Sequence, residues 1–282
     1  MCRSQIPRES QAHSGSRFDG ILESVNVALT IAGSDPSGGA GVQADLKTFH
    51  QFGVYGEAAV TLLTVQNTLS VERVECMDPG LVADQVRCVL ADIPPHAIKT
   101  GALGNAAIIE AVAMALSGGI APIVIDPVMV SKHGAPLMDS AANQTLIEQL
   151  LPLAMLLTPN IEEAQILTGL TVKSTGDMRQ AAEKLADMGA RSVLIKGGHL
   201  AGDAIDVLYY DGRWFEYPAA RVDTPHTHGT GCTYSAAITA GLALGHELPA
   251  AVEQAKRFIT EAIRFAPGFG AGCGPVNHFV NI

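Results

Sequence analysis

The sequence predicts an α/β fold, a three-layer α/β/α sandwich with a mostly parallel central sheet and a late antiparallel hairpin. From residue 25 onward, short apolar runs alternate with helical patterns, and each run is continuously apolar, as in strands buried on both faces. Asp211-Gly212 between two strand-like halves is a strong hairpin signal. Strand–helix alternation at this spacing indicates a doubly wound sheet.

Six apolar runs supply the predicted parallel strands, and a later segment supplies the hairpin. The runs are 27–32, 58–65, 97–100, 122–126, 155–158 and 192–196. We expect all six to be fully buried. The hairpin spans 206–217 and places an antiparallel pair late in the sheet.

Helices are predicted between these strands from residues that start and stop them. They are 40–52, closed by Gly53; 105–117, opened by Asn105 and closed by Gly118; 177–188, stopped by Gly189; 232–245; and about 248–265. In such sheets the ligand site lies beyond the carboxyl ends of the strands, so the residues that follow each strand are the candidates for function.

We expect a single domain over residues 25–282, because no linker, repeat or low-complexity segment follows residue 25. Residues 1–24 are expected to form a disordered N-terminal extension. They carry arginine and serine but no apolar segment of the kind that a secretory signal requires, and their acidic residues weaken an organellar transit peptide. A cytoplasmic location follows as the prediction.

Composition argues against several classes of protein. With 48% hydrophobic and 16% charged residues, the chain can bury a large core, yet no apolar run approaches the roughly 18 residues that span a bilayer. A net charge of -10 argues against a nucleic-acid-binding surface. The five cysteines are scattered without a CxxC pair, so neither a disulfide framework nor a zinc site is indicated.

A glycine-rich turn, Gly229–Cys232, runs straight into a helix of small apolar residues. Glycines let successive backbone N–H groups converge on one point, and a helix start adds unpaired donors, so the turn suits a phosphate. The thiol of Cys232 lies at the helix N-terminus, where proton affinity falls and a base becomes plausible. The alternative is a structural helix cap with a buried cysteine.

Charged and amide side chains follow the fourth, fifth and sixth predicted strands. Asp126, Asn160 and Glu163 carry the oxygen ligands that suit Mg²⁺ held mainly through its waters. Structural roles compete, since Asp126 can end a strand and Asn160 can cap the helix that carries Glu163. Lys196 ends an apolar strand, and a buried lysine requires an anion such as a nucleotide phosphate.

The Gly33–Gly41 segment after the first strand matches neither a P-loop nor a dinucleotide fingerprint. We interpret it as a close-fitting wall for a small ring-shaped ligand. Asp45 would lie about one turn further along the helix and face the pocket, with a solvated carboxylate as an equal alternative. His199 and His228 are expected to be hydrogen-bonded loop residues rather than proton carriers.

These residues together predict phosphoryl transfer, which needs positioning and charge neutralisation more than covalent chemistry. The Gly229–Cys232 turn would stabilise the moving phosphoryl group. Mg²⁺ near Asp126 and Glu163, together with Lys196, would hold the donor, and Cys232 would receive the proton of the acceptor.

Six motifs in order carry a resemblance to known enzymes. They are Ala32–Gly41, Val65–Thr68, Asp126–Met129, Thr158–Asn160, Lys196–His199 and Thr227–Thr233. Together they resemble the hydroxymethylpyrimidine/phosphomethylpyrimidine kinases of thiamine biosynthesis, within the ribokinase-like superfamily. The resemblance covers about residues 25–282.

The resemblance implies ATP- and Mg²⁺-dependent phosphorylation of 4-amino-5-hydroxymethyl-2-methylpyrimidine, and then of its monophosphate to the diphosphate. It also implies a homodimer. By position, the pyrimidine pocket would be lined by Gly33, Asp45, Gln66, Ala102 and Val128. The carboxamide of Gln66 can both donate to and accept from an aminopyrimidine edge.

The resemblance further assigns the phosphate end of the site. Asn160, Lys196 and Thr230 would bind the nucleotide, and Asp126 and Glu163 would lie near Mg²⁺. The catalytic anion hole would be formed by Gly229, Thr230, Gly231 and Cys232. Cys232 stands where related sugar kinases carry an aspartate base.

Ala102 departs from the family pattern, because many of these kinases have a methionine at this position. A smaller side chain removes part of the wall against the pyrimidine ring, so a pyridoxal or pyridoxine kinase is the alternative enzyme. A catalytically silent pyrimidine-binding protein is a third interpretation, against which intact Lys196, Glu163 and Cys232 count.

Overall fold

The computed structural model describes residues 25–119, 121–130, 134, 137–138, 140–198, 200 and 202–281. The predicted N-terminal extension, residues 1–24, lies outside this part of the chain. The strands are β1 (Val27–Ser34), β2 (Tyr55–Gln66), β3 (Val71–Cys76), β4 (Ala97–Thr100), β5 (Ile123–Ile125), β6 (Leu156–Leu157), β7 (Ser192–Ile195), β8 (Asp206–Tyr210) and β9 (Arg213–Tyr217).

The helices are α1 (Gly41–Gln51), α2 (Pro79–Asp92), α3 (Ala106–Leu116), α4 (Ser140–Thr145), α5 (Ile161–Thr168), α6 (Thr175–Asp187), α7 (Thr230–Ala243) and α8 (Leu248–Arg264). After α4 the chain continues through a π-helical turn, Leu146–Leu150, and a 3₁₀ turn, Leu151–Leu153.

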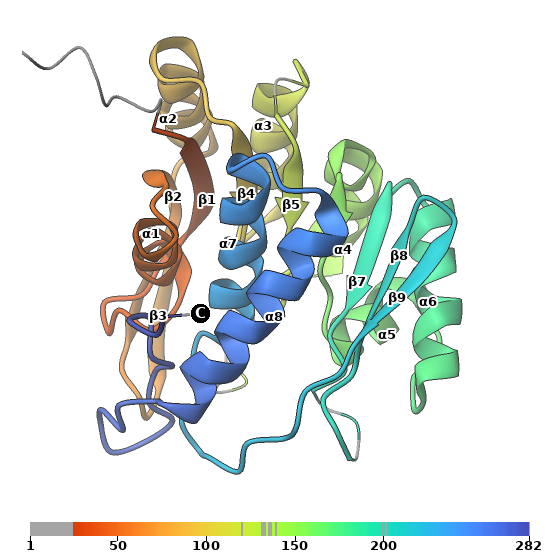
Figure 1. Ribbon diagram of the computed structural model, residues 1–282. Coiled ribbons are helices and arrows are strands. Elements are labelled where there is room, and N and C mark those ends of the chain that lie inside the picture. The colour runs from red at the N-terminus through yellow and green to blue at the C-terminus, as the bar shows by residue number, and fades with distance from the viewer. Residues whose placement is uncertain are drawn as a thin grey trace, which may run out of the picture.

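One nine-stranded sheet runs through the middle of the protein in the order β3-β2-β1-β4-β5-β6-β7-β8-β9. Strands from β2 to β7 in this order are parallel to their neighbours, whereas β3, β8 and β9 are antiparallel. Helices cover both faces, as Figure 1 shows. The predicted fold class is therefore confirmed, and the late hairpin turns at Asp211 and Gly212, both with positive φ, as a tight hairpin requires.

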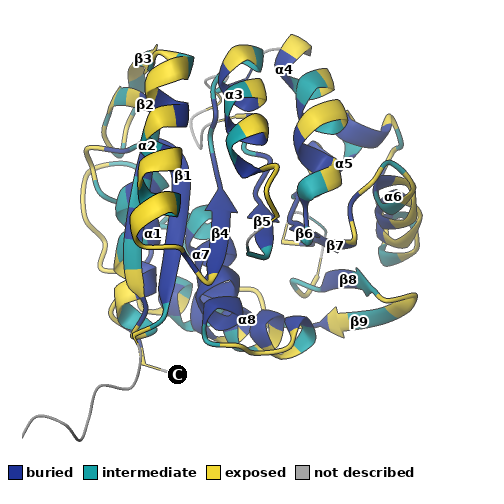
Figure 2. Ribbon diagram, turned by 90° about the horizontal axis from the view of Figure 1, so that it is seen from above, coloured by how far each residue is buried: buried dark blue, intermediate teal, exposed yellow. Residues whose placement is uncertain are grey.

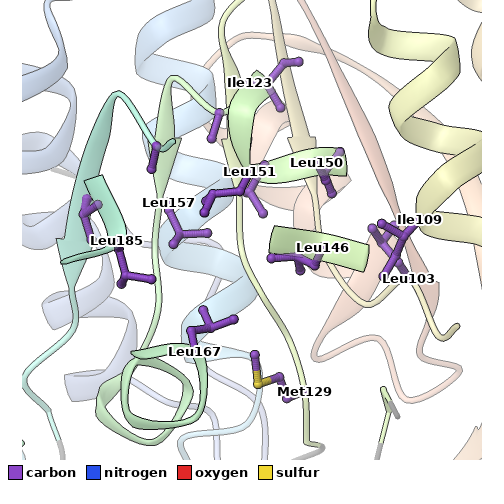
Figure 3. Close-up of a cluster of buried hydrophobic side chains, with 14 of the residues drawn as sticks. Leu103, Ile109, Ile123, Met129, Leu146, Leu150, Leu151, Leu157, Leu167 and Leu185 are labelled. Atoms are coloured by element: carbon purple, nitrogen blue, oxygen red, sulfur yellow. The ribbon is translucent and has the colours of Figure 1, made fainter. Parts of the chain in front are cut away.

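The two faces of the sheet carry separate apolar cores. Helices α1, α7 and α8 pack on one face, and α2 to α6 contribute to the core on the other. Figure 2 shows buried residues running through the sheet and the inner sides of the helices. In Figure 3, Leu146, Leu151, Leu167 and Leu185 gather near Leu157 of β6.

Two elements at one edge were not predicted, and they change the environment of β2. β3 pairs antiparallel with the outer half of β2, and α2 begins at an Asp78 N-cap followed by Pro79. The expectation that 58–65 is fully buried is wrong, since Leu63 and Val65 are 47% and 52% exposed. Because β2 extends past the helix layer here, its side chains alternate between the molecule and solvent.

α7 packs directly against the sheet because most of its side chains are small. Every residue of α7 from Thr233 to Ala243 is buried, and most are alanine, glycine, serine or threonine. The short side chains let α7 approach the sheet while α8 packs over it. As a result, the N-terminus of α7 points into the edge where the parallel strands end.

Candidate active site

A cavity of about 800 Å³ lies beyond the carboxyl ends of the parallel strands. Its walls come from segments that follow strands β1, β2, β4, β5, β6 and β7 and from the start of α7. The sequence-predicted residues that line it are Gly33, Gln66, Ala102, Asp126, Val128, Asn160, Glu163, Lys196, Gly229, Thr230, Gly231 and Cys232. Asp45 does not line this cavity.

Asp35 holds the glycine loop after β1 in shape. Its carboxylate accepts hydrogen bonds from the backbone N–H groups of Ser37 at 2.8 Å, Gly39 at 3.1 Å and Ala40 at 2.9 Å. It also contacts His228 Nε2 at 2.8 Å, which joins this loop to the turn before α7. Burial alone would raise the pKa of Asp35, but hydrogen bonds, above all with His228, hold it well below its usual range.

Only glycine can occupy position 229, at the start of α7. Its φ is +78°, and a Cβ added there would lie 1.7 Å from the backbone oxygen of Gly39. The two glycine segments therefore pack backbone to backbone. The next residues, Thr230, Gly231 and Cys232, form the first turn of α7, where helix N–H groups are left for an anion.

The predicted fall in the proton affinity of Cys232 is not observed in the protein without ligands. Burial raises the pKa of this thiol to about 11, even though the positive charge of Lys99 and the N–H of Gly41 oppose the rise. The sequence argument considered only the helix N-terminus, whereas desolvation by the surrounding segments is the larger influence. The thiol is protonated near neutral pH.

Lys196 and Asp126 form a buried ion pair across the cavity floor. Lys196 Nζ lies 2.8 Å from Asp126 Oδ1, and Thr158 and Ser235 donate hydrogen bonds to the same carboxylate at 3.2 Å and 3.0 Å. The expected anion for Lys196 is thus, in the first place, a carboxylate of the chain. The positive charge of Lys196 neutralises that of Asp126. Ser235 also donates a hydrogen bond to the backbone oxygen of Gly231, which connects the ion pair to the first turn of α7.

Asn160 and Glu163 cap α5 reciprocally, so the structural alternative considered for Asn160 is realised. The Asn160 side chain accepts from the N–H of Glu163 at 2.9 Å, and Glu163 Oε2 accepts from the N–H of Asn160 at 2.7 Å. Burial raises the pKa of Glu163 to about 7, with Lys196 opposing and Asp126 adding to the rise. Both residues still line the cavity, so a cap and a binding role are compatible.

Both predictions for Asp45 are wrong, because its carboxylate is neither solvated nor directed to the cavity. It is completely buried, and Lys99 of β4 binds both of its oxygens at 2.9 Å and 2.8 Å. Sequence reasoning missed Lys99. The signal was present, since this lysine lies in the middle of the apolar run 97–100 and a buried lysine requires a partner.

Lys256 is a second missed residue that lines the cavity. It lies on the apolar side of α8, and its Nζ contacts Asp206 Oδ2 at 2.7 Å and the backbone oxygen of Ala204 at 2.8 Å. It lines the cavity with the segment 219–224. A lysine at a buried position of an amphipathic helix is the signal that could have found it.

The remaining expectations concern histidines, metals and membranes. His228 is a hydrogen-bonded loop residue, as predicted, whereas His199 lies outside the described residues. Within the described ranges, no three His, Cys, Asp or Glu side chains gather to hold a metal ion directly. Over the same ranges, each helix is too short or too polar to cross a membrane.

We expect Asp35→Asn to lower the free energy of unfolding by about 2 to 4 kcal/mol near pH 7, because several buried donors lose a charged acceptor. The folded pKa of Asp35 is depressed, so its contribution is complete above the ordinary value of 3.8 and disappears as the pH falls below it. The stability gap between the two proteins should therefore be present near neutral pH and close in acid. Urea unfolding from neutral to acid pH measures it.

The matched control for this prediction is Asp84→Asn. Asp84 pairs with Arg87 on the surface with 72% of its side chain exposed, so its loss should hardly change stability. An Asp35→Asn protein as stable as the unaltered protein at pH 7 would contradict the proposed role of Asp35 in joining the two glycine segments.

Two curated relatives match this chain over most of its length. The hydroxymethylpyrimidine/phosphomethylpyrimidine kinase of Synechococcus elongatus is 49% identical over 257 residues, which cover 90% of this chain and 98% of that protein. The thiamine biosynthesis bifunctional protein ThiED of Geobacter sulfurreducens is 48% identical over 89% of this chain and 52% of its own length.

Solved structures share the fold over nearly the whole chain. The ADP complex of a Bacillus subtilis pyridoxal kinase superposes with a TM-score of 0.82 at 42% identity, covering 90% of this chain and 98% of that one. The Staphylococcus aureus pyridoxal kinase in complex with AMP-PCP and pyridoxal gives 0.84 at 36% identity, covering 91% and 94%.

A family model, that of phosphomethylpyrimidine kinase, matches residues 35–277. This range contains the residues that line the cavity from Asp35 to Ile263. It also contains five of the six motifs that carried the resemblance, and the first motif from Asp35 onward. The chain belongs to the phosphomethylpyrimidine kinase family, a family of phosphotransferases.

Proposed function

We propose that this protein transfers a phosphoryl group from ATP to 4-amino-5-hydroxymethyl-2-methylpyrimidine, and then to its monophosphate, in thiamine biosynthesis. One observation carries the proposal: a single cavity joins the glycine wall after β1 to the anion-binding turn of α7 and to Lys196. The names of the curated relatives support the choice of substrate.

The pyrimidine would lie between the end of β2 and the residues that follow β4 and β5. Gly33, Gln66, Ala102 and Val128 surround this part of the cavity. Gln66 offers the donor and acceptor that an aminopyrimidine edge needs. Its side chain also helps to lower the pKa of Asp35, so the two groups lie near each other at this wall of the cavity.

The hydroxymethyl oxygen would then attack the terminal phosphorus of ATP at the start of α7. The N–H groups of Gly231 and Cys232 would stabilise the phosphoryl oxygens, and Lys196 would neutralise charge on the donor. Cys232 would first lose its own proton to solvent, and the resulting thiolate would accept the hydroxyl proton. The nucleotide would extend toward Asn160 and Thr230, and ADP would leave from that end.

Mg²⁺ is proposed as the metal, because the donor set at the floor suits an ion that keeps its waters. Both oxygens of Asp126 already accept hydrogen bonds, so contact through water fits them better than direct coordination. Glu163 has a pKa raised to about 7 by burial, and a bound cation would favour its ionised form. When bound, the metal would supply charge neutralisation to the ATP phosphates.

Pyridoxal phosphorylation is a second candidate, favoured by Ala102 in the wall of the cavity. A methyl side chain leaves more room for a larger ring than the methionine of many relatives. Two of the structures that share the fold are named pyridoxal kinases, and one of them binds pyridoxal.

We further propose a homodimer formed through the exposed side of β2 and β3. Leu63 and Val65 point away from the cavity, and Leu69 in the turn between the strands is 61% exposed. An exposed apolar ribbon of this kind indicates a protein interface. Sedimentation equilibrium should give twice the mass of the chain for the protein, and a single-chain mass for a Leu63→Lys/Val65→Lys variant; an unaltered mass in that variant would contradict this interface.

The proposed function predicts ATP- and Mg²⁺-dependent formation of the pyrimidine monophosphate followed by the diphosphate. The assay compares this pyrimidine with pyridoxal side by side and identifies products by mass. A higher kcat/KM for pyridoxal would move the assignment to the second candidate. Tight pyrimidine binding without ATP consumption would contradict both kinase assignments. The expected cytoplasmic location fits a consumer of ATP, and cell fractionation tests it.

Cys232→Ala should lower kcat by about 10² to 10⁴ and leave pyrimidine binding nearly unchanged, because a proton acceptor acts in the transition state. Steady-state kinetics and calorimetric titration of the pyrimidine measure the two quantities. Cys88→Ala is the control, since Cys88 lies exposed on α2 away from the cavity. Near-normal turnover in Cys232→Ala would identify Cys232 as a structural helix cap.

A further inference from the structure

Asp45 and Lys99 form an ion pair that is complete within the interior. Neither side chain is exposed, and Lys99 Nζ lies 2.9 Å and 2.8 Å from the two carboxylate oxygens of Asp45. Thr30 donates a third hydrogen bond to this carboxylate at 2.6 Å. The group therefore ties α1, β1 and β4 together beneath the cavity.

Stability alone does not account for such a pair. The cost of removing two charges from water can exceed their attraction, and apolar residues of similar volume often serve a fold as well or better. The two charges are therefore expected to serve the cavity beside them.

The ammonium of Lys99 lies directly behind the cavity wall. A Cβ added at Gly101 would be 3.3 Å from Lys99 Nζ, and Gly101 itself lines the cavity. Only a glycine thus separates the charge from the ligand space. α7 packs against β4 and against α1, and Cys232 in its first turn lines the same cavity as Gly101.

Lys99 and Cys232 interact electrostatically, and the sign favours the thiolate. Burial raises the pKa of Cys232, and the positive charge of Lys99 is the largest influence that lowers it. The interaction is mutual, because a negative charge at Cys232 also favours the protonated form of Lys99. Four charged groups interact electrostatically with the thiol: Asp45 on α1, Lys99 on β4, Asp126 after β5 and Lys196 after β7.

We propose that Lys99 is a positioning residue for phosphoryl transfer: Asp45 clamps its ammonium behind Gly101, where this fixed positive charge stabilises the thiolate of Cys232 that accepts the proton of the acceptor hydroxyl. Asp45 then acts on the reaction through Lys99 rather than by touching the ring. The inference rests on the role given to Cys232 in the proposed function.

The test is the alkylation of Cys232 by iodoacetamide in the full chain without substrates, followed by peptide mass spectrometry. The double variant Asp45→Asn/Lys99→Met keeps the shape of the pair and leaves no unpaired buried charge, so it is expected to fold. Its Cys232 should react at least about tenfold more slowly between pH 8 and 9.5, since one pKa unit changes the thiolate fraction tenfold. The single variant Lys99→Met should show a larger decrease.

Lys256→Met is the matched control, because Lys256 is another largely buried lysine paired with an aspartate at the cavity. It should leave the rate of Cys232 alkylation and its pH profile unchanged. An unaltered rate in the double variant, or an equal decrease in the control, would overturn the proposal.

Turnover adds a second readout. In the double variant kcat should fall while the KM for ATP stays within about twofold, because Lys99 does not contact the nucleotide end of the cavity. Alkylation reports the link between Lys99 and the thiol without any turnover, whereas Cys232→Ala reports whether the thiol serves the reaction. A failure of the proposed function is therefore seen separately from a failure of this inference.

Discussion

The close approach of two glycine-rich segments is the constraint on which the site depends. Gly229 lies so near the backbone oxygen of Gly39 that no side chain fits between them. Asp35 spans the same junction, accepting hydrogen bonds from its own loop and contacting His228. Together they fix the ring wall and the anion-binding turn relative to each other, which is the geometry that transfer between two bound molecules requires.

Buried ion pairs set the electrostatics around this junction. In a chain with a net charge of -10, positive charge for phosphates has to be held locally. Three lysines lie around the site, each paired with an aspartate: Lys99 with Asp45, Lys196 with Asp126 and Lys256 with Asp206, and of these Lys196 and Lys256 line the cavity. Burial alone would lower the pKa of Lys99 and Lys196, but their aspartate partners raise it, so Lys196 can meet a phosphate at the cavity without a further cost of ionisation.

The fold could be predicted in outline because its signals are local. Continuous apolar runs identified the inner strands, and Asp211-Gly212 identified the hairpin of β8 and β9. The strand β3 was missed because it is mostly exposed and carries Glu72, Arg73 and Glu75, so it lacks an apolar run. Leu63 and Val65 of β2 are exposed because their side chains alternate with those that face the molecule, which the apolar run 58–65 does not reveal.

By itself, the sequence determined the α/β class and most of the residues predicted to line the cavity. Carboxyl ends of parallel strands meet at one edge, so residues such as Gln66, Asp126 and Lys196 come together whatever the details of packing. Only the tertiary structure decided that Asp45 binds Lys99 and that burial keeps the Cys232 thiol protonated. Both outcomes depend on side chains that α1, β4 and α7 bring together from distant parts of the chain, and the dielectric surroundings and partners of a charge do not exist until those elements pack.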